Sequence, residues 1–420
     1  MNRIIGFVLF LIVAQCVLAQ QFVSVEGTGF QLEGKPYQFI GTNLWYGMNL
    51  GVDQKGRERL TRELDRLSEM GVTNLRVLAS SEGADQYNVS PVLQTAPGAY
   101  SDQVWKGLDF LLDEMGKRNM KAVMVLNNFW MWSGGFPQYV KWVEGGEVPF
   151  PNMEGGTWDP FINYSLSFYS NKKAQNLFRD HLKVIISRTN SINGVAYRDD
   201  PAIMSWQLCN EPRGYDVPEQ YRKWLVKTAK LIQSLDKNHL VSVGSEGDTS
   251  TPRSGVDLIK DNQSKYIDYA TTHVWIQNWG WFDPEDESSY RGAQQKAKDY
   301  LTGQMEKAEQ LGKPVVIEEF GVSRDGGDFN SAASVSYRDK FYEFVFQFTV
   351  KQLGKSNLQG CNFWSWAGEG RPTKPGGFWQ EGENLIGDPP HERQGWYSVY
   401  DDDQSTVELI EKYAREVKNQ

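Results

Sequence analysis

The chain has 420 residues, of which 40% are hydrophobic and 23% are charged, as is typical of a soluble globular protein. Its formal net charge of -9 argues against nucleic acid or an anionic membrane surface as a partner. Aromatic residues are frequent, with 15 Trp, 19 Tyr and 21 Phe, and such side chains either fill a core or form stacking platforms for rings.

The N-terminal residues predict a secretory signal peptide at 1–19, followed by a single domain at 20–420. Arg3 gives a charged start, and residues 4–13 form an apolar run that is too short to span a bilayer comfortably. We expect cleavage after Ala19, with a membrane anchor or a lipidated Cys16 as the alternatives. No other stretch is apolar for long enough to cross a membrane, so we expect a secreted or periplasmic protein without membrane contact.

Short apolar runs alternate with longer amphipathic segments along the rest of the chain. The apolar runs predict strands at residues 39–43, 74–78, 122–126, 202–209, 240–243, 269–273, 315–319 and 361–366. The amphipathic segments predict helices at residues 57–70, 102–118, 172–189, 219–235, 293–311, 334–351 and 406–418. Eight strands that alternate with helices suit a closed parallel barrel. We therefore predict the α/β class, as a single-domain (β/α)8 TIM barrel with long loops at its C-terminal face.

A doubly wound open sheet is the alternative to a barrel. Such sheets bind phosphate in a glycine-rich turn after the first strand. The corresponding stretch here, GTNLWYGMNLG, carries Leu44, Trp45 and Tyr46 where a phosphate would need room. The barrel is therefore favoured, and a β-hairpin at residues 20–38 is expected to cover its floor.

Three long loops are predicted after the third, sixth and eighth strands, at residues 134–159, 275–291 and 367–396. These loops and the adjoining strand ends contain 11 of the 15 tryptophans. Loops that follow barrel strands build the active-site face, so the clustering predicts an aromatic-lined groove. The alternative is that each tryptophan packs only its own loop, since tryptophan is highly buried on average.

Cysteines and histidines give no sign of a metal or cofactor site. Cys209 and Cys361 remain after removal of the signal peptide, and they are predicted to be small core residues, with a disulfide between them as the alternative. None of the four histidines has the spacing of a zinc pair. We therefore expect no metal and no cofactor.

A carboxylate ends the fourth predicted strand in the stretch SWQLCNEPRG. Because side chains alternate along a strand, the large apolar Met204 and Trp206 are expected to face the helices, and Gln207 and Glu211 to face the barrel interior. Residues that end barrel strands at this face are catalytic in TIM-barrel enzymes. An inward ion pair with a structural role is the alternative for Glu211.

A second carboxylate ends the seventh predicted strand in KPVVIEEFGVS. Adjacent residues of a regular strand point to opposite faces, so at most one of Glu318 and Glu319 is expected in the barrel mouth. Glu319 is in phase with Val315 and Ile317. Both faces of a parallel strand are buried, however, so phase alone does not decide between the two acids.

Two glutamates at strand ends of one barrel suggest glycoside hydrolysis, in which one carboxylic acid protonates the leaving oxygen and one carboxylate attacks the anomeric carbon. Arg76 ends the second predicted strand, where it could keep a nucleophilic carboxylate ionised. His273 ends the sixth strand, with a satisfied core histidine as the alternative. The acid must hold its proton near the working pH, so the pKa of Glu211 is expected to be raised, partly by the charge of Glu319.

The motifs Asn210-Glu211-Pro212 and Glu319-Phe320-Gly321 resemble the acid/base and nucleophile motifs of glycoside hydrolase family 5. The stretch GDPPHERQGWYSVYD near the C-terminus resembles its endo-β-1,4-mannanase branch, and the resemblance runs from about Val25 to the C-terminus. It implies Glu211 as acid/base and Glu319 as nucleophile. The predicted substrate-binding residues are Arg76, Asn210, Arg213, His273, Trp275, Trp364, Asn128 and Trp45.

Two positions depart from the family pattern. Trp275 stands where many members have tyrosine, and Asn127 and Asn128 stand where many have histidine. The resemblance implies a secreted, monomeric endo-β-1,4-mannanase that cleaves mannan, glucomannan or galactomannan with retention of configuration. The alternatives are an endo-β-1,4-glucanase on the same scaffold and a non-catalytic carbohydrate-binding protein.

Overall fold

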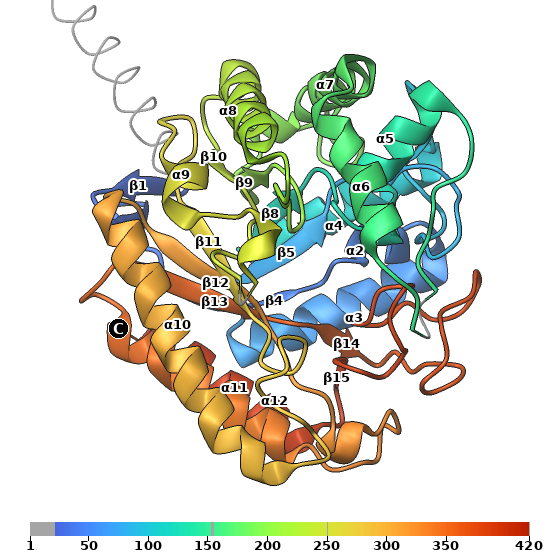
Figure 1. Cartoon of the computed structure of the whole chain (residues 1–420). Helices are drawn as coiled ribbons and strands as arrows, with labels where there is room; N and C mark the ends of the chain where they lie inside the picture. Colours follow the sequence, from blue (N-terminus) through green and yellow to red (C-terminus); the bar gives the residue numbers. More distant parts are fainter. Residues whose placement is uncertain (1–21, 153–154, 250, 420) are drawn as a thin grey trace, which may run out of the picture.

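The computed structural model describes residues 22–152, 155–249 and 251–419. Eight parallel strands at its centre form one sheet that curls into a barrel (Figure 1). In chain order they are β4 (Phe39–Asn43), β5 (Asn74–Leu78), β8 (Lys121–Val125), β9 (Ile203–Gln207), β10 (Leu240–Ser242), β11 (Ala270–Val274), β12 (Val315–Phe320) and β13 (Leu358–Phe363). Every residue of these strands is buried, because one face lines the barrel and the other packs against helices. The predicted (β/α)8 barrel is confirmed.

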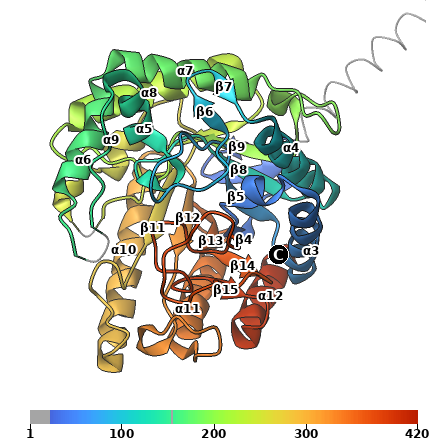
Figure 2. The same ribbon diagram turned by 90° about the vertical axis from the view of Figure 1, so that its right-hand side faces the viewer.

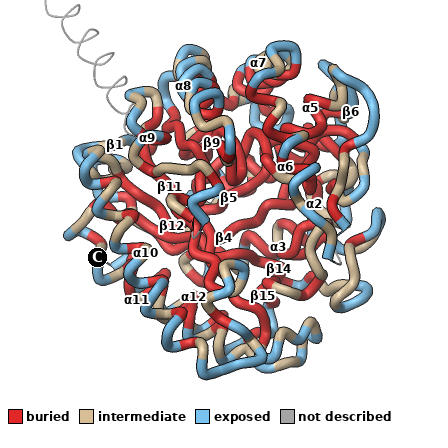
Figure 3. The backbone as a smooth tube through the Cα atoms, in the orientation of Figure 1, coloured by how far each residue is buried: buried red, intermediate tan, exposed pale blue. Residues whose placement is uncertain are grey.

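Helices alternate with the strands and surround the barrel (Figure 2). The long ones are α3 (Gln54–Met70), α4 (Asp102–Lys117), α7 (Lys172–Ile186), α8 (Pro218–Leu235), α10 (Tyr290–Gln310), α11 (Ser336–Gln352) and α12 (Gln404–Lys418). Their exposed residues lie on the outside of the molecule (Figure 3). α3 shows how the sequence sets a boundary: Asp53 accepts a hydrogen bond from the Gly56 amide at 2.7 Å, and Gly71 ends the helix with a left-handed φ of 89°.

Shorter elements lie almost entirely in segments for which no helix or strand was predicted. They are the helices α2 (Gly47–Leu50), α5 (Gly135–Glu144), α6 (Asp159–Leu166) and α9 (Leu258–Asn262), the hairpin of β6 (Gln94–Ala96) and β7 (Ala99–Tyr100), and the pair β14 (Trp366–Gly368) and β15 (Val399–Tyr400). Helices of this length are held by tertiary packing more than by their own propensity, so their sequences carry little periodic signal.

A small antiparallel sheet covers the barrel floor, as predicted for residues 20–38. It consists of β1 (Ser24–Glu26), β2 (Gly29–Leu32) and β3 (Lys35–Pro36). Phe30 and Tyr37 of this segment are buried in one cluster with Met204.

Met204 corrects the predicted alternation of the fourth barrel strand. β9 pairs with β8 through Ala122 and Ile203, then through Val123 and Ser205, so Met204 is an extra residue that opposes none on β8. A bulge of this kind changes the direction of a side chain. Met204 therefore turns into the barrel floor, and the prediction that it faces the helices is wrong.

The barrel closes between β10 and β11, where one isolated backbone bridge joins Ser242 and Tyr269. Above this bridge, hydrogen bonds from side chains also join the two strands. The Thr271 hydroxyl donates to the Ser245 carbonyl at 2.7 Å, and the Thr272 hydroxyl donates to the Glu246 carbonyl at 3.1 Å. The same Glu246 carbonyl also accepts a hydrogen bond from the His273 amide at 2.9 Å. Several hydrogen bonds between the two strands therefore lie toward the C-terminal end of the barrel.

The N-terminal segment and the two cysteines were also the subject of predictions. The predicted signal peptide at 1–19 and its boundary lie outside the described residues. Over the residues that the structure describes, none of the helices combines the length and apolarity that a membrane span needs. Cys209 and Cys361 are both buried and free, so the alternative of a disulfide between them is not realised.

Candidate active site

The carboxyl ends of the barrel strands border a cavity of about 740 Å3. It is lined by Trp130, Trp132, Trp158, Asn210, Glu211, Arg213, Glu246, Thr251, Trp275, Asn278, Trp279, Glu319, Trp364, Phe378, Pro389, His391, Glu392, Arg393 and Trp396. Seven of these residues are tryptophans, as expected for an aromatic-lined groove. Other tryptophans have the packing role that was the alternative. Trp366, for example, is fully buried and donates its indole N–H to Glu63 at 2.7 Å.

Glu211 follows β9 at the rim of this cavity, in a backbone conformation that ordinary strands do not adopt. Its φ is 47°, in the left-handed region, although it precedes Pro212, which favours extended backbone for the preceding residue. The Glu211 amide donates to the Gly244 carbonyl at 2.9 Å, which fixes the turn. Such strain persists where the surrounding structure determines it, and it is concentrated at functional sites.

β12 brings both of its adjacent carboxylates into the barrel. On the neighbouring β11, Thr272 pairs with Ile317 and the next residue, His273, pairs with Glu319, so Glu318 is an extra residue at a bulge. Glu318 lies deeper in the barrel and Glu319 at its mouth, and both are buried. The expectation that at most one of the two acids points inward is therefore wrong, because it assumed a regular strand.

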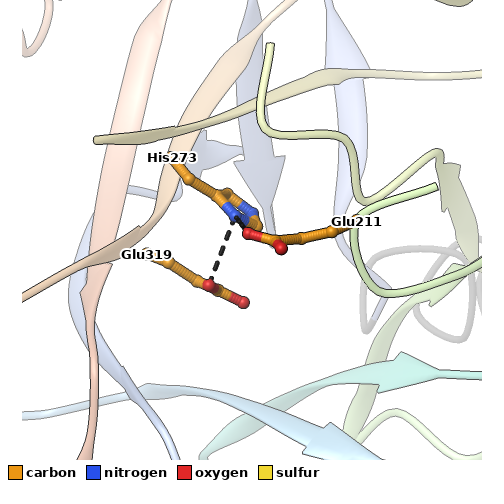
Figure 4. Close-up of side chains that lie close together, drawn as sticks. All are labelled: Glu211, His273 and Glu319. Carbon is orange, nitrogen blue, oxygen red and sulfur yellow. Dashed lines mark hydrogen bonds and ion pairs between the residues drawn. The ribbon is translucent and has the colours of Figure 1, made fainter. Parts of the chain in front are cut away.

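Glu211, His273 and Glu319 form a compact trio, shown in Figure 4. His273 Nδ1 lies 2.8 Å from Glu211 Oε1 and 3.3 Å from Glu319 Oε2. One carboxylate oxygen of each glutamate and a ring nitrogen of the histidine all lie within 4.8 Å of one another. The two acids, 108 residues apart in sequence (319 − 211 = 108), are thus brought together by β9 and β12, which are separated around the barrel by β10 and β11.

Arg76 lies at the centre of β5, not at the end of its strand as predicted, and it contacts the Glu319 carboxylate of the trio. Its guanidinium donates to Glu319, to Asn210 Oδ1 at 2.7 Å, to Gln207 Oε1 at 2.7 Å and to Asn43 Oδ1 at 3.1 Å. All of its partners are buried, so the positive charge acts with little screening by water. Arg76 therefore holds the Glu319 carboxylate in place through a charge-assisted hydrogen bond.

The pKa of Glu211 shifts in the direction opposite to the prediction. Burial alone would raise the pKa of this carboxyl, but the hydrogen bond and charge of His273, the charge of Arg213 and the N–H of Trp130 together lower it to about 2. Burial opposes the charge on His273, yet Glu319 and the hydrogen bonds to both glutamates raise the pKa of the imidazole to about 10. The prediction overlooked that a protonated histidine would lie between the two acids.

These shifts predict how His273 affects stability as a function of pH. A folded-state pKa of about 10, above the ordinary value of 6.5, means that the charged ring stabilises the fold fully below pH 6.5 and loses this effect as the pH rises to 10. His273→Asn is therefore expected to lower Tm more at pH 6 than at pH 10. Equal losses at both pH values, measured by calorimetry, would show that His273 is neutral in the folded protein.

Three residues form the wall beside Glu211. Trp130 Nε1 donates to Glu211 Oε2 at 2.8 Å. The Arg213 guanidinium carbon lies 5.0 Å from the centre of the Trp130 ring, and Glu246 holds Arg213 with two hydrogen bonds of 2.6 and 2.8 Å. This arrangement fixes the planar groups on the side of the cavity that Glu211 faces.

The predicted substrate-binding residues fall into two groups. Asn210, Arg213, Trp275 and Trp364 line the cavity. The other four are buried and do not line the cavity. Arg76 donates a hydrogen bond to Glu319, and His273 contacts both glutamates. Asn128 accepts a hydrogen bond from Asn210 Nδ2 at 3.2 Å, and Trp45 donates one to the Gly387 carbonyl at 2.7 Å.

Asn128 and Trp45 therefore correct the prediction of direct sugar contact. The Asn128 side chain is fully buried and is also used by the Trp130 amide, which donates to its Oδ1 at 3.0 Å. Trp45 lies behind Trp132, with ring centres 5.4 Å apart, so Trp132 rather than Trp45 faces the cavity.

Sequence reasoning missed several residues that line the cavity, among them Glu246, His391 and Glu392. Glu246 carried a signal of the same kind as the two main acids, because it follows the fifth barrel strand. His391 and Glu392 lie in a loop of irregular structure, where no periodic pattern points to an inward side chain.

Trp364 lines the cavity, and the family resemblance implies that it forms the floor for the reacting sugar. It is only 4% exposed, contacts Trp132 and Trp275, and its indole N–H has no hydrogen-bond partner within the described part of the chain. Trp364→Ala is expected to weaken transition-state binding by about 1–3 kcal/mol, the scale of other ring-stacking losses. Steady-state kinetics of the folded variant tests this, and unchanged kcat/KM would assign Trp364 to the core.

Among the described residues, Glu211, His273 and Glu319 are the side chains whose oxygen and nitrogen atoms lie close enough together to bind a metal ion. Arg76 donates to Glu319, and the pKa of His273 is raised to about 10. Two positive charges already balance the two carboxylates, so this chemistry fits proton transfer and nucleophilic attack better than cation binding.

Comparisons with known proteins agree with this chemistry. Residues 20–420 match a family model described as GH family 5 beta-mannosidase-like. A putative mannan endo-1,4-beta-mannosidase 4 of Arabidopsis thaliana is 30% identical over 437 residues, which cover 97% of each chain. The mannan endo-1,4-beta-mannosidase 4 of Solanum lycopersicum is 30% identical over 374 residues, which cover 85% of this chain and 86% of that protein.

Solved structures show the same relationship. A glycoside hydrolase family 5 mannosidase from Rhizomucor miehei has a TM-score of 0.88 and 38% identity, and the match covers 96% of this chain and 98% of that chain. A mutant of that mannosidase, solved in complex with mannosyl-fructose, has a TM-score of 0.89 with the same identity and coverage. The chain described here therefore belongs to the mannosidase-like group of glycoside hydrolase family 5 and is a glycoside hydrolase.

Proposed function

We propose that this protein hydrolyses β-1,4-mannosidic bonds by a double displacement that retains the anomeric configuration. The observation that carries the proposal is the short separation of Glu211 and Glu319, whose oxygens approach within 4.8 Å. Retaining glycosidases hold their two carboxyl groups about 5–5.5 Å apart, whereas inverting enzymes need roughly 6.5–9.5 Å to admit a water molecule.

Each carboxylate has one role in the first step. Glu319, held by Arg76, attacks the anomeric carbon while the bond from that carbon to the leaving oxygen breaks. Glu211 gives its proton to the leaving oxygen. In the second step Glu211 takes a proton from water, which attacks the glycosyl ester and releases Glu319.

The low pKa of Glu211 in the free protein has a consequence for this acid role. His273 and Trp130 donate hydrogen bonds to its carboxylate and stabilise the charged form. A sugar that enters the space between the two acids competes with these donors, which weakens that stabilisation. Substrate binding is therefore coupled to protonation of Glu211, and the proton arrives before the bond breaks.

Cleavage of internal bonds is the first candidate mode, which makes the protein an endo-β-1,4-mannanase acting on mannan, glucomannan or galactomannan. The names of the Arabidopsis and tomato relatives support it. We further propose that the protein is secreted, on the basis of the predicted signal peptide at 1–19, and that it acts as a monomer. An endo-β-1,4-glucanase is the remaining alternative on this scaffold, and activity on mannan against a soluble cellulose derivative decides between them.

Removal of sugars from a chain end is a second candidate mode, which the loops favour. The loops after β5 and β13 meet across the barrel mouth, where the Ser90 hydroxyl donates to Glu381 at 2.6 Å and the Tyr87 and Phe378 rings lie 5.9 Å apart. His391 is stacked near Trp132, at 6.4 Å. β5 and β13 are the two neighbours of β4, so the contacts between their loops lie on the β4 side of the barrel. We infer that they leave less room there for a second sugar beyond the reacting one.

A product profile separates the two modes. Mannohexaose reduced at its reducing end with borohydride is incubated with the protein, and the early products are resolved by chromatography. Internal cleavage gives oligosaccharides of intermediate length from the start, whereas cleavage from the non-reducing end gives mannose and reduced mannopentaose. Proton NMR of the first product tests retention, which predicts the β-anomer before mutarotation. An initial α-anomer would contradict the double displacement.

A further inference from the structure

Glu318 is a buried acid that the proposed reaction does not use. It is 1% exposed, lies next to the nucleophile and faces the same barrel interior because of the bulge in β12. Burying a carboxylate is costly unless nearby groups compensate it. The partners of Glu318 therefore indicate what this position contributes.

Gln207, at the end of β9, connects Glu318 to the catalytic arginine. Its amide nitrogen donates to the two Glu318 oxygens at 2.9 and 2.7 Å, and its amide oxygen accepts from Arg76 Nε at 2.7 Å. Arg76 Nε also lies 3.7 Å from a Glu318 oxygen. The chain of contacts then continues from Arg76 to the carboxylate of Glu319.

The orientation of the Gln207 amide is decisive in this chain. An arginine N–H needs an acceptor, so Gln207 must turn its oxygen toward Arg76 and its nitrogen away. The carboxylate of Glu318 can only accept when ionised, and it occupies the nitrogen side. A turned amide would present N–H groups to Arg76 and leave Glu318 without a donor, so Glu318 selects the orientation that supports Arg76.

We propose that Glu318 is a positioning residue, which fixes the amide of Gln207 and thereby holds Arg76 in place against the nucleophile Glu319. This inference rests on the proposed function, in which Glu319 is the nucleophile. Both acids of the Glu-Glu pair then have a function. The first acid of the pair orients the arginine that the second acid needs.

The test compares Glu318→Ala with Glu318→Gln on an aryl β-mannoside. Glu318→Ala removes the acceptor, and kcat/KM is expected to fall about 10- to 100-fold, the usual effect of losing a supporting hydrogen-bond partner. Glu318→Gln keeps a carbonyl oxygen for Gln207 and is expected to restore most of the activity. A folded Glu318→Ala variant with unchanged kcat/KM, or a Glu318→Gln variant as impaired as Glu318→Ala, would overturn the proposal.

A double-mutant cycle with Gln207→Ala separates positioning from a general loss of stability. Because both residues act on Arg76 through one path, the double variant is expected to be little worse than either single one. Losses that multiply would contradict a shared path. If Glu318→Ala does not fold, Gln207→Ala alone decides, since normal kcat/KM in that variant would also refute the link.

Asp261→Ala is the matched control. Asp261 is also a buried carboxylate paired with an arginine, at 2.9 Å from Arg222, but it lies on α9 outside the barrel. It is expected to lower Tm and to leave kcat/KM unchanged. If the wild-type protein does not hydrolyse β-mannosides, the proposed function fails, and the same variants are compared on the β-glycoside that it does hydrolyse.

Discussion

Replacing Glu319 with alanine is expected to lower kcat/KM on every β-mannoside by on the order of 10⁴- to 10⁶-fold, the scale found when a hydrolase loses a group of its nucleophilic machinery. Without this carboxylate no covalent glycosyl intermediate can form. The loss should not depend on the leaving group, because attack at the anomeric carbon is required for all of them. Initial rates on aryl mannosides of graded phenol acidity test this.

Azide gives a second measurement on the Glu319→Ala protein. A small anion in the space of the missing carboxylate attacks the anomeric carbon from the same side, so the product is expected to be the α-mannosyl azide. The opposite assignment of the two acids predicts the β-mannosyl azide instead. Full turnover of Glu319→Ala together with an inactive Glu318→Ala would identify Glu318 as the nucleophile.

Glu211→Ala is expected to have an effect that depends on the leaving group. On mannobiose, whose leaving sugar needs a proton, the rate should fall about 10²- to 10⁴-fold. On a mannoside of an acidic phenol the first step needs no proton, so a rapid burst of phenol should precede slow hydrolysis of the glycosyl ester.

Stopped-flow absorbance measures this burst, and added azide should release the trapped enzyme as the β-mannosyl azide. Glu392→Gln is a useful comparison, because Glu392 also lines the cavity but has no part in the proposed proton transfer. Absence of a burst in Glu211→Ala, with equal losses on both substrates, would show that Glu211 does not act as the general acid.

The sequence predicted the barrel well because its signal is local. β4 and β5 begin and end where the apolar runs at 39–43 and 74–78 do. β13 was placed three residues late, since Gln359 and Gly360 interrupt the apolar pattern at its start. Short helices such as α5 were missed because neighbouring elements hold them, and a single sequence does not show those neighbours.

The site was predicted as a set of residues more successfully than as a geometry. Strand-end position and motif selected Glu211 and Glu319, which the structure brings to one cavity, and their catalytic roles stay a prediction. The register shifts at Met204 and Glu318 were not visible, because a bulge depends on how two strands pair and not on either strand alone. The predicted direction of the Glu211 pKa shift was also wrong because it depends on a contact between distant segments. His273, which sets this pKa, lies 62 residues away in sequence.

The closure between β10 and β11 has a consequence for the chemistry of its side chains. Neighbouring barrel strands are normally joined by amides, which every residue except proline supplies, whereas here the hydroxyls of Thr271 and Thr272 supply two of the hydrogen bonds beside the His273 amide. Valine has the same shape and suits strands at least as well. At residue 271 it would leave the Ser245 carbonyl without its donor, whereas the Glu246 carbonyl would still accept the His273 amide at 2.9 Å and the Tyr300 hydroxyl at 2.6 Å. A replacement that suits most strands would therefore weaken the junction of β10 and β11, close to the histidine that bridges the two acids.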